Sequence, residues 1–472
     1  MVNNCSINKL FNFGKDKSFI IALLPCWLFY LYVCAARVEP SVLVTELTND
    51  FGITSSLIGF IISMACVPYV LTQIPYGVIT DRIGAKIIVA VGYAMCAVGV
   101  LIFGMATSVF QLELGRFIIG FFSASAYLCC GKVTNIYFSK QKYALLMGWA
   151  AGIGSLGSML GTTPISLLTH HIGWRNTTYI MAALGICLSI ITFIIMPADK
   201  KANKSNGSRF LSKPPESDLM EGDTEHRTAV YFDVHEDSST VSTSQKTDYE
   251  EFRERSGADL FNGLKILIKN PRSWLLGVYG AILFLPLSAL AELWMIPFME
   301  VRFGVSTERA SFGSVALFLG FTGGNLLSSW IAEKIDSCKK VMIVCSIVFT
   351  LALWRAIFSD SIDYNTCLML LLITGIMAGS NIFSFSLAYN MVPEKYGGTS
   401  VGFINAVIML SGVIFQPLLG KLLDLFRNGM VDGGGHPVYT VEIYRHAFTS
   451  IIIGAVLAVC STFFVEDSKH RG

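Results

Sequence analysis

Long apolar segments constrain the fold of this chain more than any other feature of its sequence. Hydrophobic residues make up 53% of the 472 residues and charged residues only 14%, whereas about a quarter of the residues of a soluble protein are charged. The apolar excess falls in blocks of about 20 residues, the length at which a helix crosses roughly 30 Å of hydrocarbon. The pattern therefore predicts an all-α chain of twelve membrane spans. They lie near residues 18–44, 54–79, 87–106, 109–131, 144–168, 174–196, 274–299, 309–332, 340–358, 365–391, 398–420 and 446–465.

Lys and Arg in the short loops predict the orientation of the chain. An even number of spans places both termini on one side, and the loops on that side carry more Lys and Arg than the others. Cytoplasmic loops carry such an excess, so we expect both termini in the cytoplasm and the protein in a cell membrane (inner or plasma). The first apolar segment is too long for a signal peptide and lacks a small-residue cleavage site, so it is expected to be retained.

A polar segment divides the spans into two sets of six. Residues 197–257 are rich in Ser, Thr, Asp, Glu and Lys, and such a composition cannot bury a core, so we interpret them as a largely disordered cytoplasmic linker. Apolar residues then recur at helical spacing until Asn270-Pro271, which predicts an amphipathic interfacial helix over 258–273. The predicted organisation is a cytoplasmic segment 1–17, a six-helix bundle 18–196, the linker, the interfacial helix, a second bundle 274–465 and a cytoplasmic tail 466–472.

A charged turn joins the second and third predicted spans. Gly77 allows two helices to approach closely, and Gly84 permits a turn geometry that is costly for other residues. Arg82 and Lys86 favour the cytoplasmic side, while Asp81 is suited to pair with the positive N-terminus of a neighbouring helix. This Gly-x-x-x-Asp-Arg-x-Gly-x-Lys pattern resembles the loop between helices 2 and 3 of the major facilitator superfamily.

Other segments support the same resemblance across both sets of spans. Residues 115–120 resemble the Arg-x-x-x-Gly motif of the fourth helix in that family, and residues 397–402 and 416–420 resemble the ends of its eleventh helix. The fifth span departs from the pattern of drug/proton antiporters, because it has no Gly-Pro pair and Pro164 comes late.

Similar short segments at corresponding places in the two sets of spans indicate an internal repeat. Residues 329–336 stand where a second copy of the loop motif belongs and keep an acidic residue before a basic one, although they lack both glycines. Trp174-Arg175 opens the sixth span and Tyr444-Arg445 opens the twelfth. The resemblance implies the twelve-transmembrane-helix major facilitator fold, in which two six-helix halves form a pseudo-two-fold repeat around a site at the midplane.

Arg37 lies in the first span and is a candidate substrate-binding residue. An Arg at the bilayer centre costs roughly 2.5–3.5 kcal/mol on insertion scales, so a retained one is a functional candidate. The alternative is a helix that ends at Ala36 and leaves Arg37 at the interface. Residues 37–42 occupy the place where organophosphate:phosphate antiporters carry a phosphate-binding Arg. Residues 286–294 lack the second Arg that those transporters use, which argues against a phosphate ester.

Glu292, in the seventh span, is a candidate for proton coupling. The charged form of a carboxyl group is disfavoured at membrane depth, so Glu292 is expected to bind and release a proton. The alternative is a Glu near the outer end that pairs with Arg302 or Arg309. Arg116 in the fourth span is a further candidate, because the resemblance links it to proton transfer or helix packing. Glu113 lies three residues before Arg116, so an ion pair within the helix is the competing interpretation.

Several uncharged polar residues in the spans are candidates for lining a substrate cavity. Each of them can also form a hydrogen bond between helices, which is the more common role of such residues. These candidates are Tyr30, Gln73, Tyr76, Trp294, Asn381, Tyr389, Asn390 and Asn405.

These observations predict a secondary active transporter that works by alternating access as a monomer in the lipid bilayer. A cationic residue in one half and an acidic one in the other suit an anionic or zwitterionic metabolite, carried together with H⁺. No nucleotide-binding motif or metal-ligand spacing occurs in the sequence, so we expect no enzyme activity, no cofactor, no metal and no nucleic-acid partner. Two alternatives stay open: an efflux transporter for an amphipathic compound, and a non-transporting sensor that signals through the linker.

Overall fold

The chain folds into a bundle of helices. The computed structural model describes residues 19–138, 140–197, 262–393, 396–431 and 437–465. Within those ranges the chain is helical apart from short turns, and an isolated bridge between Val431 and Pro437 is the sole β pairing there. The predicted N-terminal segment, linker and C-terminal tail lie outside the described residues, apart from residue 197. Of the predicted interfacial helix 258–273, residues 262–273 are described: 262–269 are helical, Asn270 interrupts the helix, and the next helix begins at Pro271.

Helices before residue 197 form the first half of the molecule. They are η2 (Phe19–Leu23), α2 (Leu24–Val38), η3 (Glu39–Val42), α3 (Val44–Phe51), α4 (Ser55–Ser63), α5 (Cys66–Ile83), α6 (Ala85–Gly104), α7 (Val109–Ser123), α8 (Ser125–Tyr137), α9 (Lys140–Leu160), α10 (Thr163–Ile172) and α11 (Trp174–Ile195).

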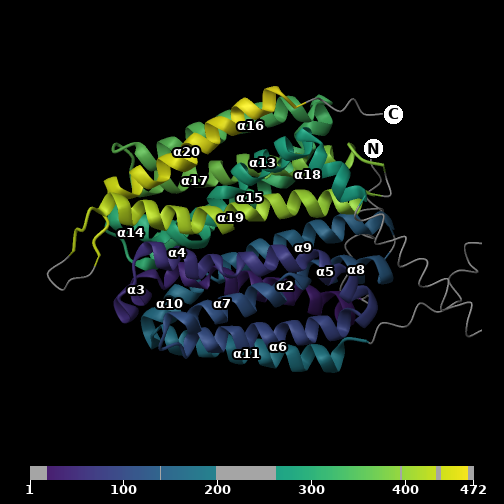
Figure 1. Ribbon diagram of the computed structural model, residues 1–472, viewed down its shortest axis with the longest axis horizontal. Helices are drawn as coiled ribbons and strands as arrows, with labels where there is room; N and C mark the ends of the chain where they lie inside the picture. The colour runs from purple at the N-terminus through teal and green to yellow at the C-terminus, as the bar shows by residue number, and fades with distance from the viewer. Residues whose placement is uncertain (1–18, 139, 198–261, 394–395, 432–436, 466–472) are drawn as a thin grey trace, which may run out of the picture.

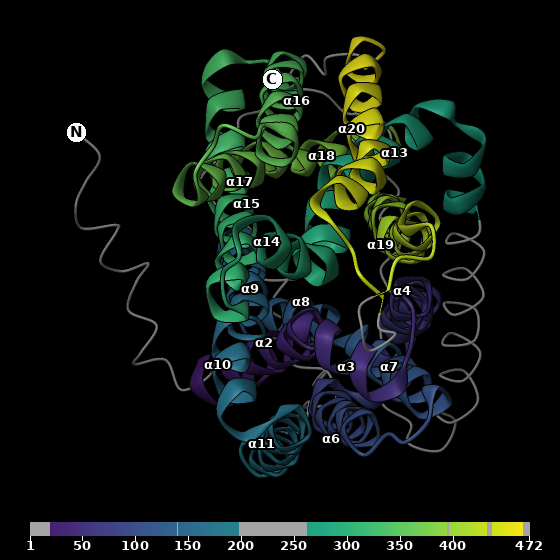
Figure 2. The same cartoon turned by 90° about the vertical axis from the view of Figure 1, so that its left-hand side faces the viewer.

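Helices after residue 270 form the second half. They are α13 (Pro271–Leu285), η5 (Pro286–Trp294), α14 (Met295–Phe303), α15 (Thr307–Ile335), α16 (Cys338–Phe358), α17 (Tyr364–Ala378), η6 (Gly379–Asn381), α18 (Ile382–Tyr389), α19 (Gly397–Arg427) and α20 (Val441–Phe463). The two halves lie side by side with their helices roughly parallel (Figures 1 and 2).

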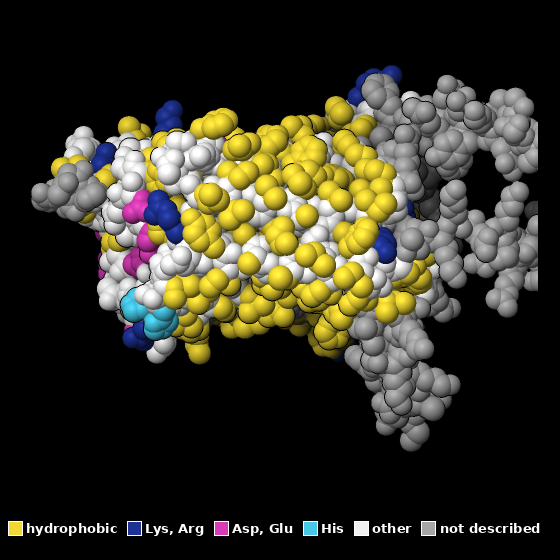
Figure 3. Space-filling model, turned by 90° about the horizontal axis from the view of Figure 1, so that it is seen from below, with side chains coloured by type: hydrophobic (Ala, Val, Ile, Leu, Met, Phe, Trp, Pro, Cys, Tyr) yellow, Lys and Arg dark blue, Asp and Glu magenta, His cyan; other side chains and the backbone are white. Residues whose placement is uncertain are grey.

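The lengths and composition of these helices suit a membrane. Among the described residues, 11 helical segments are long and apolar enough to cross one. The predicted fifth span, 144–168, corresponds to α9 followed by α10 and is not among the eleven. On the face that Figure 3 shows, apolar side chains cover the middle of the surface and charged side chains gather toward its ends. The all-α class expected from the sequence is thereby confirmed.

The bundle has two ends, which we name by their residues. The Gly84 end carries the turn between α5 and α6 together with Met196 and Val465, and the α3 end carries α3, α10 and α14 (Figure 1). At the Gly84 end, Gly84 has φ +95°, a backbone conformation that favours glycine. Asp336 ends α15 at the corresponding place in the second half, with φ +52°, although the sequence there lacks glycine.

The α3 end shows the same repeat in its ion pairs. Arg175, at the start of α11, pairs with Asp50 at 2.5 Å. Arg445, near the start of α20, pairs with Asp360 and with Glu442. The two Arg residues that the sequence placed at equivalent positions therefore both pair with a carboxylate outside their own helix, Asp50 in α3 and Asp360 in the turn after α16.

Candidate functional site

Two helices lose regular geometry where the halves meet, and proline is present at both places. The first span changes from α-helix to a 3₁₀ turn at Glu39–Val42, which contains Pro40. The seventh span changes to a π-helix at Pro286–Trp294, where the Met295 N–H donates to the carbonyl of Leu290, five residues earlier. Proline cannot donate the helical hydrogen bond, and single π turns are frequent at functional sites. Both candidate residues, Arg37 and Glu292, lie at these irregular segments.

An ion pair joins the two halves at this point. Arg37 Nη2 on α2 lies 2.7 Å from Glu292 Oε1 on η5. The helix continues through Val38, so the alternative in which it ends at Ala36 is wrong. The alternative partner Arg302 instead donates to backbone carbonyls at the C-terminal end of α16, including that of Ile357 at 3.1 Å.

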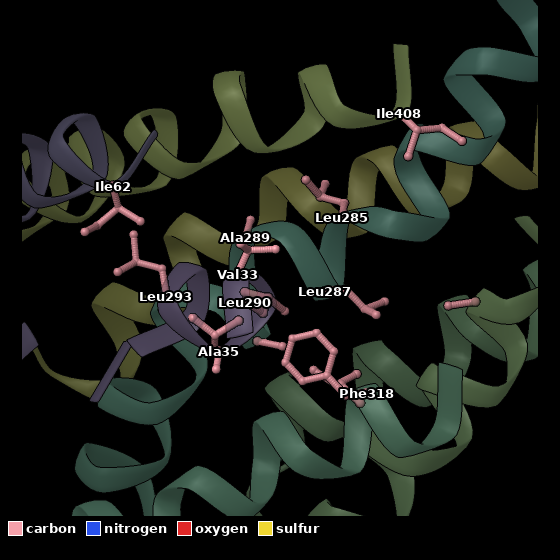
Figure 4. Packing of buried hydrophobic residues seen from close by; sticks show 14 of the residues in the cluster. Val33, Ala35, Ile62, Leu285, Leu287, Ala289, Leu290, Leu293, Phe318 and Ile408 are labelled. Atoms are coloured by element: carbon pink, nitrogen blue, oxygen red, sulfur yellow. The ribbon is translucent and has the colours of Figure 1, made fainter. Parts of the chain in front are cut away.

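The pair lies among apolar side chains. Val33 and Ala35 on α2 lie near Ala289, Leu290 and Leu293 of η5 (Figure 4), and all five are buried. In such surroundings water screens charges weakly, so opposite charges attract strongly and an unpaired charge is costly. Each charge at this site therefore requires a partner, whether a side chain or a ligand.

Arg37 retains some capacity for a further partner. Its side chain is 20% exposed, against 3% for Glu292, and its Nε has no hydrogen-bond partner among the described residues. Tyr69, Cys34 and Cys66 are close enough to interact with it electrostatically. A guanidinium group can bind a carboxylate through two parallel hydrogen bonds, so Arg37 is suited to a second anion.

Arg116 contacts the backbone of the first span. Its Nη1 donates to the carbonyl of Ala36 and its Nη2 to the carbonyl of Arg37, both at 3.0 Å. The last carbonyl groups of a helix lack partners within that helix, and Arg116 supplies donors for two of them. Glu113 is half-buried on α7, and no ion pair is found between it and Arg116 among the described residues. Arg116 thus holds the turn that presents Arg37.

Gln416 contacts the other member of the pair, and the sequence analysis did not select it as a site residue. Its Nε2 donates to the carbonyl of Ser288 at 2.7 Å and lies 3.5 Å from Glu292 Oε2. The backbone carbonyl of Gln416 accepts a hydrogen bond from Trp294 Nε1 at 3.3 Å. Trp294, one of the predicted cavity residues, therefore lies beside the ion pair. The available signal was the segment 416–420, which had been noted only for its family resemblance.

Glu39 is a second buried carboxylate that the sequence analysis missed. It is 2% exposed, and Thr178 Oγ1 donates to its Oε1 at 3.0 Å. Arg116 is close enough to interact with it electrostatically. Its position two residues after Arg37, directly before Pro40, was the signal that would have identified it.

The other predicted cavity residues are dispersed. Tyr30 is near Arg37 and packs against Tyr127 with ring centroids 5.4 Å apart, whereas Tyr76 packs against Phe121. The remaining ones do not join the ion pair in the structure. Of these, Asn381 is buried, Gln73 and Asn405 are half-buried, and Tyr389 and Asn390 are exposed.

The predicted gating motif lies at the Gly84 end. Lys86 sits over the ring of Phe193, with its Nζ 5.1 Å from the ring centroid. The side chains of Asp81 and Arg82, and the packing of Gly77, lie outside what the structure describes. The pairing of Asp81 with the positive N-terminus of a neighbouring helix, for which we expect the start of α19 at Gly397, therefore stays a prediction.

A helical bundle built from two repeated halves, with charged residues where the halves meet, is typical of membrane transporters. The sequence model of the Major Facilitator Superfamily matches residues 26–416. The chain therefore belongs to the major facilitator superfamily. It is a multi-pass integral membrane protein of a transporter family and not an enzyme.

Known relatives share this architecture at low sequence identity. The chain is 21% identical over 394 residues to the D-galactonate transporter of Escherichia coli O6:H1, covering 82% of this chain and 85% of the relative. It is 21% identical to the probable galactarate/D-glucarate transporter GudP of Bacillus subtilis, with 87% of each chain covered. The membrane sensor protein UhpC of Escherichia coli K12 is 20% identical, with 86% of each covered.

A solved structure supports the fold. The bacterial homologue of the human lysosomal transporter Spinster, in an inward-facing and occupied conformation, superposes with a TM-score of 0.72 at 14% identity. The match covers 96% of this chain and 97% of the other. At this identity the likeness concerns the fold alone.

Proposed function

We propose that this chain is a secondary active transporter that moves a small organic anion or zwitterion together with a proton. The observation that carries the proposal is the ion pair between Arg37 and Glu292, which connects the two halves at 2.7 Å. Alternating access moves the halves of such folds against each other around a central site. A charged contact between the halves at that site can therefore respond to both substrate and proton.

Competition between Glu292 and the substrate for Arg37 would couple the binding of the proton to the binding of the substrate. While Glu292 is ionised it satisfies the charge of Arg37. A proton on Glu292 removes the negative charge, and Arg37 then needs another anion because an unpaired buried charge is costly. A substrate carboxylate fulfils that need, so proton and anion bind together. Arg116 holds the turn that carries Arg37 and Gln416 contacts Glu292, so both are positioning residues in this mechanism.

The substrate class follows from the donor set and from the relatives. Arg37 is paired with the carboxylate of Glu292. A carboxylate group on the solute can take the place of that partner, so the site suits a solute with such a group. The relatives named above include transporters of D-galactonate and of galactarate or D-glucarate, which are sugar acids. We infer that a carboxylate-bearing metabolite of this size is the substrate, with Tyr30 and Trp294 beside it.

Orientation and oligomeric state are part of the same proposal. The excess of Lys and Arg in loops at the Gly84 end favours that end as the cytoplasmic one in a cell membrane, and the α3 end is then the outer one. Both charged residues of the pair come from one chain, so a monomer contains the complete site.

Transport in proteoliposomes tests the proposal. With D-galactonate and D-glucarate as probes, the wild-type protein should accumulate solute when the outside is more acidic. Glu292→Gln should abolish this accumulation and retain exchange of labelled for unlabelled solute. Arg37→Lys should raise the half-saturating concentration at least tenfold, because Lys lacks the planar fork of Arg.

Two exposed residues provide matched controls for these variants. Arg355→Lys and Glu333→Gln change the same chemical groups on exposed helix surfaces and should leave uptake unchanged. Normal gradient-driven accumulation by both Glu292→Gln and Arg37→Lys would refute the proposed coupling.

A sensor is the second candidate function, because the relative UhpC is a membrane sensor protein. A sensor would bind the solute through the same Arg37 without moving it. Solute-dependent thermal stabilisation of the purified protein, in the absence of any flux or exchange in vesicles, would favour the sensor over the transporter.

A further inference from the structure

The N-terminus of α4 is capped by the other half of the molecule. The first N–H groups of a helix have no partner within that helix, and Thr54, at the N-cap position, makes no side-chain hydrogen bond to these N–H groups. The Ser56 N–H instead donates to Asp424 Oδ2 at 2.7 Å. The Ser55 N–H donates to the hydroxyl of Tyr439 at 3.2 Å. Both acceptors come from the second half.

Asp424 and Tyr439 act as one unit. The Tyr439 hydroxyl donates to Asp424 Oδ1 at 2.6 Å, so both carboxylate oxygens accept a hydrogen bond. A carboxylate at a helix N-terminus also interacts favourably with the positive end of the helix dipole. The Asp424 carboxylate therefore accepts hydrogen bonds from two donors, the Ser56 N–H and the Tyr439 hydroxyl, and its charge also interacts favourably with the dipole of α4.

Next to this cap, the backbones of α4 and α19 are in direct contact. A Cβ added to Gly59 would collide with the backbone of Gln416 and Pro417, and one added to Gly420 would collide with the backbone of Ser55. Only residues without a side chain allow such an approach. The two helices thus touch directly at the α3 end, where Figure 2 shows α4 beside α19.

One face of α19 connects this end to the ion pair. Gln416, Gly420 and Asp424 follow each other at intervals of four residues, so they share a face of the helix. Gln416 contacts Glu292, and Asp424 lies two turns further, about 12 Å along the axis.

We propose that Asp424, braced by Tyr439, is the latch that holds the α3 end of the transporter closed. The inference rests on the proposed function, because alternating access requires contacts between the halves to break at each end in turn. When the α3 end opens, α4 and α19 separate, and the Ser55 and Ser56 N–H groups lose their acceptors. The latch thus stabilises the closed state relative to the open one.

A native cysteine can report the opening. Cys66 is close enough to Arg37 and Glu292 to interact with them electrostatically, and its Sγ lies beside Gly412 of α19, one turn beyond Gln416 from the α3 end. A membrane-impermeant maleimide added from the α3 end of the full-length protein in oriented proteoliposomes should label Cys66 slowly in the wild type. Asp424→Asn keeps the shape of the side chain and removes its charge, and labelling should be at least fivefold faster. Tyr439→Phe should increase the rate by a smaller factor.

Two controls make the result specific. Asp360→Asn alters a carboxylate at the same end whose partner, Arg445, belongs to the same half, so it should not change the labelling rate. Adding Cys66→Ser to Asp424→Asn should remove the additional label. An unchanged rate in folded Asp424→Asn and Tyr439→Phe, or an equal increase in Asp360→Asn, overturns the proposal. Labelling requires no flux, so faster labelling without transport would leave the latch intact and refute only the proposed transport function.

Discussion

Arg37 and Glu292 are expected to depend on each other for stability, apart from the transport role proposed for them, because they form one buried ion pair. Removing one partner of a buried ion pair leaves an uncompensated charge and costs about 3–5 kcal/mol, whereas replacing both by apolar residues is often neutral. Because Arg37 remains 20% exposed, the charge that is left when Glu292 is removed is partly solvated, and the loss on removing Glu292 belongs at the low end of that range.

We therefore expect Glu292→Met and Arg37→Met each to lower the melting temperature of the purified protein, and the double variant to recover most of the loss. Thermal unfolding in detergent, followed by intrinsic fluorescence, measures the three values. Additive losses in the double variant would show that the two residues contribute independently.

Gln416 is expected to matter through the carbonyl it satisfies. Gln416→Leu leaves the Ser288 carbonyl of the π segment without its donor, and an unsatisfied buried group costs about 1–3 kcal/mol. Ser411→Ala is the matched control, since Ser411 contacts the Ser288 hydroxyl at 3.0 Å and not Glu292. Unfolding of both variants should show the larger loss for Gln416→Leu, and equal losses would contradict this role.

Asp50 provides a pH-dependent prediction outside the membrane. Burial opposes its ionisation, but hydrogen bonds from Arg175 and Trp174 outweigh this effect and lower the pKa of Asp50. A lowered folded-state pKa stabilises the protein above the unfolded pKa of about 3.9, and the gain is lost as pH falls through the folded value.

Asp50→Asn should therefore reduce stability at pH 7 by no more than about 1 kcal/mol, because the pair is partly exposed. The difference from the wild type should shrink as pH falls below the unfolded pKa and vanish below the folded pKa of Asp50. Melting temperatures of both proteins across this range provide the test, and a difference that persists at low pH would point to lost packing.

At the residue scale, the sequence identified Arg37 and Glu292 because charged residues are rare in apolar spans. It did not identify Gln416 or Glu39. Gln416 became significant only through a contact between helices more than a hundred residues apart in the chain. Glu39 was overlooked because a carboxylate near a predicted helix end is ordinarily solvated.

Elements were predictable where their signal was local. Apolar length located the spans, and the positive φ of Gly84 was expected from the turn motif. The π-helix at Pro286–Trp294 and the 3₁₀ turn at Glu39–Val42 were not predicted, because apolar length does not depend on hydrogen-bond register. Proline was visible in both segments, but its effect depends on which neighbouring groups accept or donate.

Close packing between α4 and α19 leads to a prediction at this scale. Gly420→Ala should force the two helices apart, lower the melting temperature by several degrees and impair transport. Gly323→Ala is the control within α15, because a Cβ there meets no described atom within 4 Å. Equal melting temperatures for the two variants would show that the contact between α4 and α19 tolerates a methyl group.

The whole molecule was predictable as a two-half bundle, whereas the distance between its halves was not. Hydropathy and the similar segments in the two halves indicated the repeat. No pattern in the sequence predicted that Arg37 and Glu292 would be in direct contact. Their contact depends on how the halves are tilted, which is a property of the assembled bundle.

Residues 200–256, which lie outside the described residues, are expected to be dispensable for transport. Their composition cannot bury a core, so a flexible replacement about half as long should keep the rate of uptake in vesicles. Loss of uptake in a folded, shortened variant would show that the linker is regulatory and would favour the sensor.

The pairing of Arg37 with Glu292 also determines how the membrane voltage acts on the carrier. The empty site holds one positive and one negative side chain, and the buried Arg116 and Glu39 add one of each. Under the proposed coupling, a proton and a monovalent anion add no net charge, so neither the loaded nor the empty carrier moves charge across the membrane. Each transported charge would otherwise contribute about 2.3 kcal/mol per 100 mV. Uptake of a monocarboxylate should then follow the pH gradient and ignore the potential, whereas a dicarboxylate carried with a single proton would be electrogenic.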